Sequence, residues 1–245
     1  MSSSTRGRTL GIIPIREADV FAAGQPVRLA GKPLLSFTVD AAREADRLDR
    51  TVVTTDGERA AEFARSLGAD VPFIRPQDLA RPGVGIWQVL QHCLLWLEEH
   101  QTDRFDHVVL LEPSHPVRPR GLVNRVVEAL STSDCDSVLT AHEERHAFWM
   151  QTPEGEIRPV AMDNESSRQK RAPLFREVAG LACASRHGVV AAGRGPGRNV
   201  GIVPVRSWIG LIDTQDPFGL LVAEKLLEAA REHPDLAGEA LVGIG

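Results

Sequence analysis

Three charged side chains each follow a short apolar or β-branched segment of this 245-residue sequence. They are Arg16 after Leu10–Ile15, Asp56 after Thr51–Thr54, and Glu112 after Val108–Leu111. A guanidinium stabilises charge that builds on phosphate oxygens, so Arg16 is predicted to face a phosphate. Glu112 is predicted to be a metal ligand or a hydrogen-bond acceptor, because a carboxylate after four apolar residues needs a partner. Asp56 is consistent with a nucleotide contact and, more simply, with a helix cap.

The segments that carry these residues alternate with helical patterns. Strands are expected at 10–15, 51–54, 71–74, 108–111, 137–140, 179–185 and 199–205, and helices at 33–45, 58–67, 85–100, 122–130 and 216–231. This alternation predicts an α/β fold with a doubly wound, mostly parallel nucleotide-binding sheet flanked by helices. Ligands bind such sheets beyond the carboxyl ends of the strands, which places Arg16, Asp56 and Glu112 at one edge.

The sequence becomes more polar between residues 142 and 176. This stretch includes Phe148–Met150 and the basic residues Arg168, Lys170, Arg171 and Arg176. It is predicted to leave the sheet as a dimerisation or acceptor-binding excursion, although a basic run is also typical of a solvated face. The chain is otherwise expected to be one domain, 1–245, with a flexible N-terminus at 1–9.

Composition narrows the class of protein. The formal net charge of −5 excludes a global basic field that would recruit nucleic acid or an anionic membrane. No apolar run reaches the roughly 20 residues of a membrane span. The three cysteines lack metal spacing and are typical of a reducing compartment. A cytoplasmic protein with no nucleic-acid or membrane partner is therefore expected.

Seven segments, in order, resemble the acylneuraminate cytidylyltransferase family. They are Gly11–Arg16 (family "IIPAR"), Leu29–Leu35 ("LAGKPL"), Thr54–Asp56 ("STD"), Gly68–Pro76 ("GAEVPFxRP"), Leu110–Arg118 ("LLQPTSPLR"), Phe175–Glu177 ("YRE") and Ile212–Thr214 ("DIDT"). The matches span roughly residues 10–220. The resemblance implies a Mg²⁺-dependent, homodimeric enzyme that transfers CMP from CTP to an acidic acceptor, such as a sugar acid or a phosphonate, and releases pyrophosphate.

The resemblance also implies roles for individual residues. Catalysis falls to Arg16 and Glu112, and metal binding to Asp213, which is equally consistent with a helix cap. Nucleotide contacts fall on Ile13, Pro14, Ile15, Arg16, Lys32 and Asp56. Acceptor contacts fall on Arg118, Arg168, Gln169 and Arg176.

Several positions depart from the family pattern. The family's phosphate loop carries glycines and lysines, whereas Glu17–Pro26 has two acids, one glycine and no lysine. Leu211 replaces the first aspartate of the metal pair, and Glu112 replaces a glutamine. These losses leave open an alternative, a catalytically inactive relative that acts as a nucleotide-binding or scaffolding subunit. A third possibility is an enzyme of similar architecture that binds a nucleotide sugar.

Overall fold

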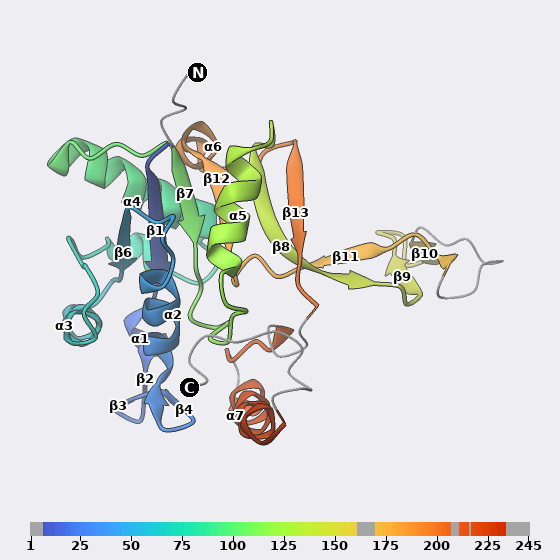
Figure 1. Cartoon of the computed structure of the whole chain (residues 1–245), viewed down its shortest axis with the longest axis horizontal. Coiled ribbons are helices and arrows are strands. Elements are labelled where there is room, and N and C mark those ends of the chain that lie inside the picture. The colour runs from blue at the N-terminus through green and yellow to red at the C-terminus, as the bar shows by residue number, and fades with distance from the viewer. Residues whose placement is uncertain (1–6, 161–169, 207–210, 216, 234–245) are drawn as a thin grey trace.

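The computed structural model describes residues 7–160, 170–206, 211–215 and 217–233. A seven-stranded sheet forms its centre (Figure 1). Its strands are β1 (Thr9–Pro14), β6 (Arg50–Thr54), β7 (His107–Leu110), β8 (Ser137–Glu144), β11 (Leu174–Glu177), β12 (Cys183–Arg186) and β13 (Val200–Pro204). The predicted α/β architecture with a sheet of mostly parallel strands is confirmed.

The strand order is β11-β8-β12-β7-β1-β6, and β13 pairs with β8. Strand β1 lies between β6 and β7 and is parallel to both, with Ile12 opposite Val52 and Leu110. Strand β12 is antiparallel to β7 and β8, and β13 runs parallel to β8. The carboxyl ends of β1, β6 and β7 therefore meet at one edge of the sheet.

Alternation of side chains along the strands divides the core into two layers. Ile13, Val53 and Val109 lie in the layer that includes α2 (Leu34–Arg43), α3 (Glu58–Ser66) and α5 (Leu122–Ser131). Their neighbours Ile12, Val52 and Val108 face the other way, toward α4 (Ile86–Gln101) and α6 (His187–Ala192). Because successive strand residues point to opposite faces, these continuous apolar runs fit strands that are covered on both sides.

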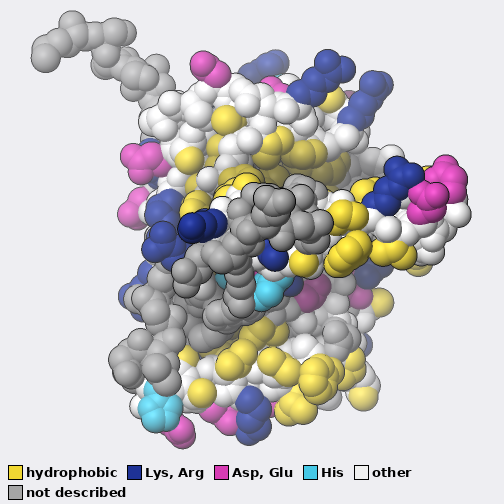
Figure 2. Space-filling model, turned by 90° about the vertical axis from the view of Figure 1, so that its right-hand side faces the viewer, with side chains coloured by type: hydrophobic (Ala, Val, Ile, Leu, Met, Phe, Trp, Pro, Cys, Tyr) yellow, Lys and Arg dark blue, Asp and Glu magenta, His cyan; other side chains and the backbone are white. Residues whose placement is uncertain are grey.

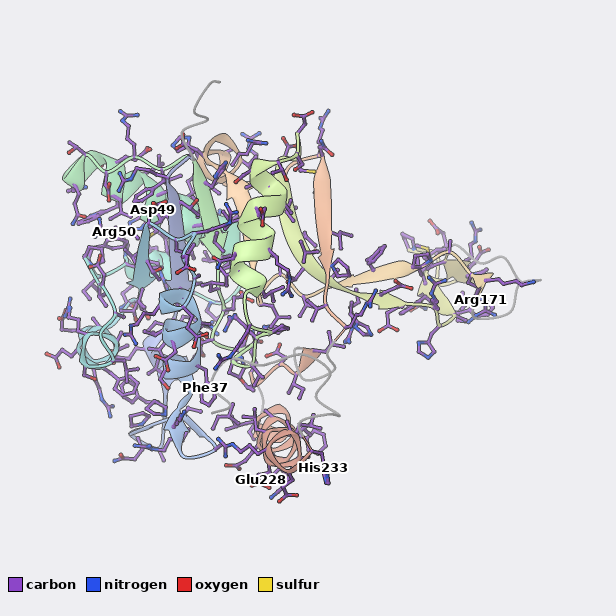
Figure 3. The ribbon with its side chains drawn as sticks, in the orientation of Figure 1. Phe37, Asp49, Arg50, Arg171, Glu228 and His233 are labelled. Atoms are coloured by element: carbon purple, nitrogen blue, oxygen red, sulfur yellow. The ribbon has the colours of Figure 1, made fainter. Side chains whose placement is uncertain are left out.

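At the opposite edge of the sheet, where β1, β6 and β7 begin, ion pairs connect β6 to neighbouring segments. Arg50, labelled in Figure 3 together with its neighbour Asp49, lies at the start of β6. It donates from Nη2 to Asp70 Oδ2 at 2.6 Å and from Nη1 to Asp103 Oδ2 at 3.0 Å. Asp49 Oδ2 accepts a hydrogen bond from the Thr9 amide at 2.7 Å. These contacts join segments that lie far apart in the sequence.

A third apolar cluster lies beyond the carboxyl edge. It packs α7 (Pro217–Glu232) through Ala223 and Leu227 against Phe37 of α2 and Leu29. Leu29 belongs to a short hairpin, β4 (Arg28–Leu29) with β5 (Lys32–Pro33). Pro33 precedes α2, so the predicted start of that helix is confirmed to within one residue.

Several regions differ from the sequence-based expectation. The strand expected at 179–185 begins only at Cys183, as β12, and helix α6 was not expected. Residues 71–74 form no strand, only isolated bridges of Asp70 and Ile74 to the neighbouring β6 segment. The expected loop at 17–26 contains the helical turn α1 (Glu17–Val20) and a hairpin, β2 (Phe21–Ala22) with β3 (Gln25–Pro26). The η1 turn (Gln77–Ala80) is a further short element.

The predicted excursion projects from the sheet. The end of β8 pairs with β11, and a hairpin of β9 (Phe148–Gln151) and β10 (Ile157–Val160) lies beyond them (Figure 1). We call residues 142–160 and 170–177 the arm. In the described part of the chain, no helix is long and apolar enough to cross a bilayer.

Candidate active site

The carboxyl edge of β1, β6 and β7 carries Arg16, Asp56 and Glu112, as the sequence predicted. The Ile15 amide donates to Thr54 O at 3.0 Å, and the Leu111 amide donates to Ile12 O at 3.0 Å, so both neighbours of β1 stay paired up to the edge. Side chains that follow these strands are therefore delivered to one rim of the sheet.

Arg16 forms an ion pair within its own segment. Its Nε and Nη2 donate to Oδ2 and Oδ1 of Asp19 at 2.7 and 3.2 Å. The pair is about half exposed. Hydrogen bonding and charge from Asp19 raise the pKa of Arg16, and the Asp56 carboxylate adds to the effect. Arg16 is thus a permanent cation at the rim that already has an anionic partner.

Asp56 fixes the segment after Arg16 and does not cap α3. Its Oδ1 accepts a hydrogen bond from the Glu17 amide at 2.8 Å. The N-cap of α3 is Gly57, which makes no side-chain cap. Instead Glu17 Oε2 accepts from the Ala60 amide at 3.1 Å, so the acid that caps the helix comes from a distant segment. The capping interpretation of Asp56 is wrong, and its nucleotide contact stays a prediction.

The hairpin after Arg16 is docked on α3. The Phe21 and Phe63 rings lie 5.7 Å apart, and the Arg59 guanidinium lies 4.0 Å above the Phe21 ring. Arg59 Nη2 also donates to Gly24 O in the hairpin turn. Together with the bond from the Ala60 amide of α3 to Glu17, these contacts pack the α1 turn and the β2–β3 hairpin against α3.

Glu112 lies in a group of polar side chains with His115, Asp213 and the backbone of Gly180. The Glu112 amide donates to Gly180 O at 2.8 Å. A Cβ atom on Gly180 would overlap both Glu112 Oε2 and His115 Nδ1, so the two side chains share the space above this glycine. Burial raises the pKa of Glu112, and the charge of Asp213 raises it further.

The residues that follow Asp213 in the chain, Thr214 and Gln215, fix its position near Glu112 and His115. The Thr214 amide and hydroxyl donate to Ser114 O at 2.8 and 3.0 Å. Asp213 Oδ1 accepts from the Gln215 amide at 2.9 Å, which is a local turn in front of α7. The charge of Asp213 acts on Glu112, so the two side chains belong to the same polar group. The bond to Gln215 lies before Pro217, the first residue of α7, so it is a local turn and not the helix cap that the sequence left open.

This pair of carboxylates fits a magnesium ion. Among the described residues no three or more potential ligands form a metal site. Mg²⁺ is commonly held by one or two carboxylates together with substrate phosphates and water, so Glu112 and Asp213 fit a site that the nucleotide completes. Burial and, after it, the charge of Asp213 raise the pKa of Glu112, and a bound cation would favour the ionised carboxylate.

Arg118 is not available to an acceptor, which corrects the prediction from the family pattern. Its side chain is fully buried. It donates from Nε to Leu181 O at 2.7 Å, from Nη1 to Thr38 Oγ1 at 2.9 Å, and from Nη2 to Glu112 O at 2.7 Å and Gly180 O at 3.0 Å. Burial lowers the pKa of Arg118 to about 9. The guanidinium joins backbone segments behind the site.

A second buried arginine supports the β1 and β6 side. Arg75 donates from Nη2 to Ile15 O and from Nη1 to Thr54 O, both at 3.0 Å. Burial lowers its pKa, with opposing charge from Asp56. The sequence carried Arg75 in a family match but suggested no role for it.

The remaining predicted residues occupy different places. Ile13 and Ile15 are buried, and Pro14 ends β1. Lys32 is exposed in the β4–β5 hairpin. Arg176 is exposed on β11, 3.7 Å from Glu144 Oε1. Arg168 and Gln169 lie outside the described residues.

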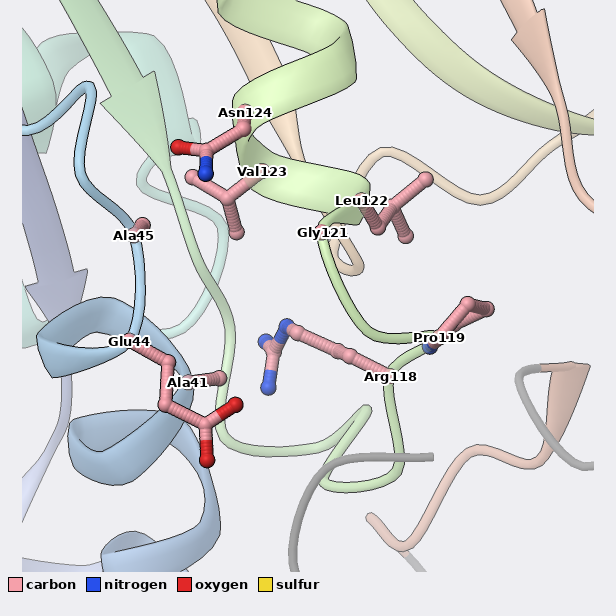
Figure 4. A pocket seen from close by; sticks show the side chains of 9 residues that line it. All are labelled: Ala41, Glu44, Ala45, Arg118, Pro119, Gly121, Leu122, Val123 and Asn124. Atoms are coloured by element: carbon pink, nitrogen blue, oxygen red, sulfur yellow. The ribbon is translucent and has the colours of Figure 1, made fainter. Parts of the chain in front are cut away.

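A small pocket lies behind the site, between the end of α2 and the start of α5 (Figure 4). Its lining residues are Ala41, Glu44, Ala45, Arg118, Pro119, Gly121, Leu122, Val123 and Asn124. The Arg118 nitrogens are all engaged by protein oxygens, so the pocket offers no free guanidinium to an anionic ligand.

Sequence comparisons show which known proteins this chain resembles. Residues 27–81 match the family model described as Cytidylyltransferase. CMP-N,N'-diacetyllegionaminic acid synthase of Legionella pneumophila is 24% identical over 92% of this chain and 98% of its own length. The mitochondrial 3-deoxy-manno-octulosonate cytidylyltransferase of Arabidopsis thaliana is 35% identical, over 54% of this chain and 43% of its own length.

Solved structures share the fold at low sequence identity. CMP:2-keto-3-deoxy-manno-octonic acid synthetase, solved with CTP, superposes with a TM-score of 0.63 and 13% identity, covering 91% of this chain and 99% of that one. 4-diphosphocytidyl-2C-methyl-D-erythritol synthase of Anaerococcus prevotii gives a TM-score of 0.62 and 10% identity, covering 90% and 98%. The chain is therefore similar in sequence to cytidylyltransferases that make CMP-sugar acids, and it shares the fold of the solved cytidylyltransferase structures.

Proposed function

We propose that this protein is a CTP-dependent cytidylyltransferase that transfers CMP to an acidic acceptor, a sugar acid or a phosphonate, and releases pyrophosphate. The observation that carries the proposal is the meeting of Glu112 and Asp213 at the same sheet edge as Arg16, in a chain whose full-length relative makes a CMP-sugar acid. This edge is where α/β sheets bind their ligands.

The reaction is an in-line displacement at the α-phosphorus of CTP. An anionic oxygen of the acceptor forms the new bond to phosphorus, the bond to the β-phosphate oxygen breaks, and its electron pair leaves with pyrophosphate. Arg16, once released from Asp19, would neutralise charge on the phosphate oxygens. Such a mechanism needs positioning and charge neutralisation and no covalent enzyme intermediate.

Glu112 and Asp213 are proposed to hold magnesium together with the nucleotide phosphates. When bound, the ion would supply charge neutralisation to the phosphates. Around it, Ser114 would keep Asp213 in place through the Thr214 amide and hydroxyl. The Glu112 main chain would stay anchored to Gly180 through its amide.

Pyrophosphate release from CTP, measured with a panel of sugar acids and phosphonates, tests the proposal. Release that depends on both one acceptor and Mg²⁺ is the expected result, and the corresponding GTP and ATP reactions serve as controls. Loss of release in Asp213→Asn, with folding retained, would connect the activity to this site. Release in the absence of any acceptor would contradict transfer.

A non-catalytic, nucleotide-binding relative is the second candidate. The ion pair of Arg16 with Asp19 and the leucine at 211 favour it, because both reduce charge stabilisation of the phosphates. This candidate predicts no pyrophosphate release with any acceptor. A CTP-dependent rise in melting temperature without turnover would distinguish nucleotide binding from a purely scaffolding role.

The arm is proposed to form a homodimer interface. Trp149, Met150 and Ile157 are 60, 51 and 61% exposed on its β9–β10 hairpin, more than packing within one chain would leave open. Trp149 and Ile157 lie on one face of the hairpin and Met150 on the other, and exposed apolar side chains that gather on one element are typical of an interaction site. A cytoplasmic location remains the prediction made from the cysteine pattern.

A further inference from the structure

Gly180 and Arg118 form one structural unit beneath Glu112. Gly180 O accepts from the Glu112 amide at 2.8 Å and from Arg118 Nη2 at 3.0 Å. The same Nη2 donates to Glu112 O at 2.7 Å. Both polar groups of the Glu112 main chain are therefore fixed by contacts to Gly180 or Arg118.

The side chains of Glu112 and His115 occupy the space where a side chain of residue 180 would lie. A methyl group there would overlap Glu112 Oε2 and the His115 ring. The backbone of Gly180 does not require a glycine, because its φ is not positive. The requirement comes from the close approach of two polar side chains, one of which, Glu112, is placed in the proposed site.

His115 also belongs to this unit. Its Nδ1 lies 3.1 Å from Ser114 Oγ, and the main chain of Ser114 holds Thr214 beside Asp213. Burial and the charge of Arg118 lower the pKa of His115, and the charge of Asp213 opposes them. The ring therefore lies close to Asp213 as well as to Glu112.

We propose that Gly180 and Arg118 are positioning residues that seat Glu112 and His115 at the reaction centre without touching substrate. Gly180 provides the space for both side chains, and Arg118 fixes the main chain of Glu112 and of residues 180–181. Thr38 of α2 accepts a hydrogen bond from Arg118 Nη1 and so helps to fix this arginine. We call Gly180, Arg118 and Thr38 the seat of Glu112 and His115. This inference rests on the proposed nucleotidyl transfer.

Gly180→Ala tests the seat, and Gly188→Ala is the matched control. The added methyl must displace Glu112 or His115, and a displacement of about 1 Å from reacting groups costs on the order of 100-fold in rate. We expect kcat to fall by about that factor in Gly180→Ala. Gly188 in α6 has open space where a Cβ atom would lie, so Gly188→Ala is expected to keep the wild-type rate.

A spectroscopic measurement separates this inference from the proposed function. The ring ¹⁵N resonances of His115, assigned with His115→Gln, are expected to move in Gly180→Ala and to stay in place in Gly188→Ala at the same pH. If the wild-type protein releases no pyrophosphate, the proposed function fails, but the resonance shift still tests the seat. Unchanged resonances in Gly180→Ala, or a wild-type kcat, would overturn the inference.

Thr38 offers a test that leaves the site itself untouched. Thr38→Val removes the partner of Arg118 Nη1, whereas Thr38→Ser keeps the hydroxyl. We expect kcat to fall in Thr38→Val with little change in KM for CTP, and to recover in Thr38→Ser. Equal loss of activity in both variants would contradict the positioning role, because Thr38→Ser keeps the hydroxyl that accepts from Arg118 Nη1.

Discussion

The carboxylate of Asp19 would compete with a phosphate for the guanidinium of Arg16. Asp19 occupies two donors of the guanidinium that is proposed to bind a phosphate. Surface ion pairs are worth about 0–1 kcal/mol, so release of Arg16 costs little but not nothing. We expect Asp19→Asn to bind CTP up to about fivefold more tightly in isothermal titration, since 1 kcal/mol corresponds to roughly that ratio.

Asp40→Asn is the matched control for this prediction. Asp40 pairs with Arg43 at the same spacing along the chain and similar exposure, but on α2. Its loss should leave CTP affinity unchanged. Weaker binding in Asp19→Asn would instead mean that Asp19 orients Arg16 for the nucleotide, and the competition model would be wrong.

Glu112 gives the stability of the protein a specific pH dependence. Burial and the Asp213 charge raise the pKa of Glu112 above its ordinary value of 4.5. The folded state therefore holds the proton more tightly than the unfolded state. The stability that this preference contributes is present below the ordinary pKa and is lost as pH rises through the folded-state pKa.

Glu112→Gln removes the ionisable group and with it the loss of stability that follows its ionisation at higher pH. Relative to wild type, the variant should gain stability as pH rises above the ordinary value of 4.5 and should keep that gain above the folded-state pKa, at roughly 1.4 kcal/mol for each tenfold difference in proton affinity. Urea unfolding at several pH values measures the difference. Glu99→Gln, an exposed substitution on α4, should give parallel curves. A wild type that becomes relatively more stable toward high pH would refute the assignment.

At the scale of elements, the hairpin after β1 and helix α3 stabilise one another. Glu17 caps α3 across the chain, and Gly57 leaves no room for a side chain between them. We expect Glu17→Ala to lower the free energy of unfolding by about 1 kcal/mol, as the loss of a helix cap does. Urea denaturation measures this change.

Two further variants show whether capping is the cause. Glu17→Gln keeps an acceptor for the Ala60 amide but loses the charge near the helix N-terminus, so its cost should be smaller. Glu62→Ala, exposed within α3, should be close to neutral because alanine is a strong helix former. A neutral Glu17→Ala would show that the cap contributes nothing measurable.

Periodicity predicted the elements whose side chains form the core. Strands β1 and β7 contain short apolar runs, β6 is rich in β-branched residues, and helices such as α4 carry a stripe that includes Leu90 and Leu97. Their parallel pairing then placed Arg16, Asp56 and Glu112 at one edge. The α1 turn and the β2–β3 hairpin were missed because contacts with Phe63 and Arg59, distant in sequence, stabilise them.

The role of an individual site residue was harder to predict than its location. Arg118 matched a family motif and looked like an acceptor ligand, but its guanidinium turns inward to backbone carbonyls that only the folded chain brings together. Gly180 carried no sequence signal, because its importance comes from two side chains that arrive from another segment. Asp19, three residues after Arg16, was a signal that helical spacing could have revealed.

At the scale of the whole molecule, the two edges of the sheet differ in how their charges are used. Arg50 at the amino edge is balanced by Asp70 and Asp103 in ion pairs that link segments. At the carboxyl edge burial and then the charge of Asp213 raise the pKa of Glu112, and Arg118 Nη2 donates to the main-chain oxygens of Glu112 and Gly180. A metal–nucleotide complex bound at this edge would add a counter-charge that favours the ionised form of Glu112.

The arm makes oligomeric state the property of the whole molecule that is most open to test. Hydrophobic side chains gather on the face that carries it (Figure 2), and Phe148 and Phe175 are 37 and 44% exposed there. A second copy of this chain would bury them against an identical surface, as two-fold interfaces do. We expect size-exclusion chromatography with light scattering to give a dimer for the wild type.

Trp149→Glu and Ile157→Glu should shift that dimer to monomer, because each places a charge in the centre of the apolar surface. Leu95→Glu, a similar change at a 42% exposed leucine on α4, should leave the dimer intact. If monomeric Trp149→Glu protein still releases pyrophosphate at the wild-type rate, each subunit holds a complete site and the arm serves assembly alone. A monomeric wild type at all concentrations would refute the interface, and the exposed arm would then have to be explained by the acceptor.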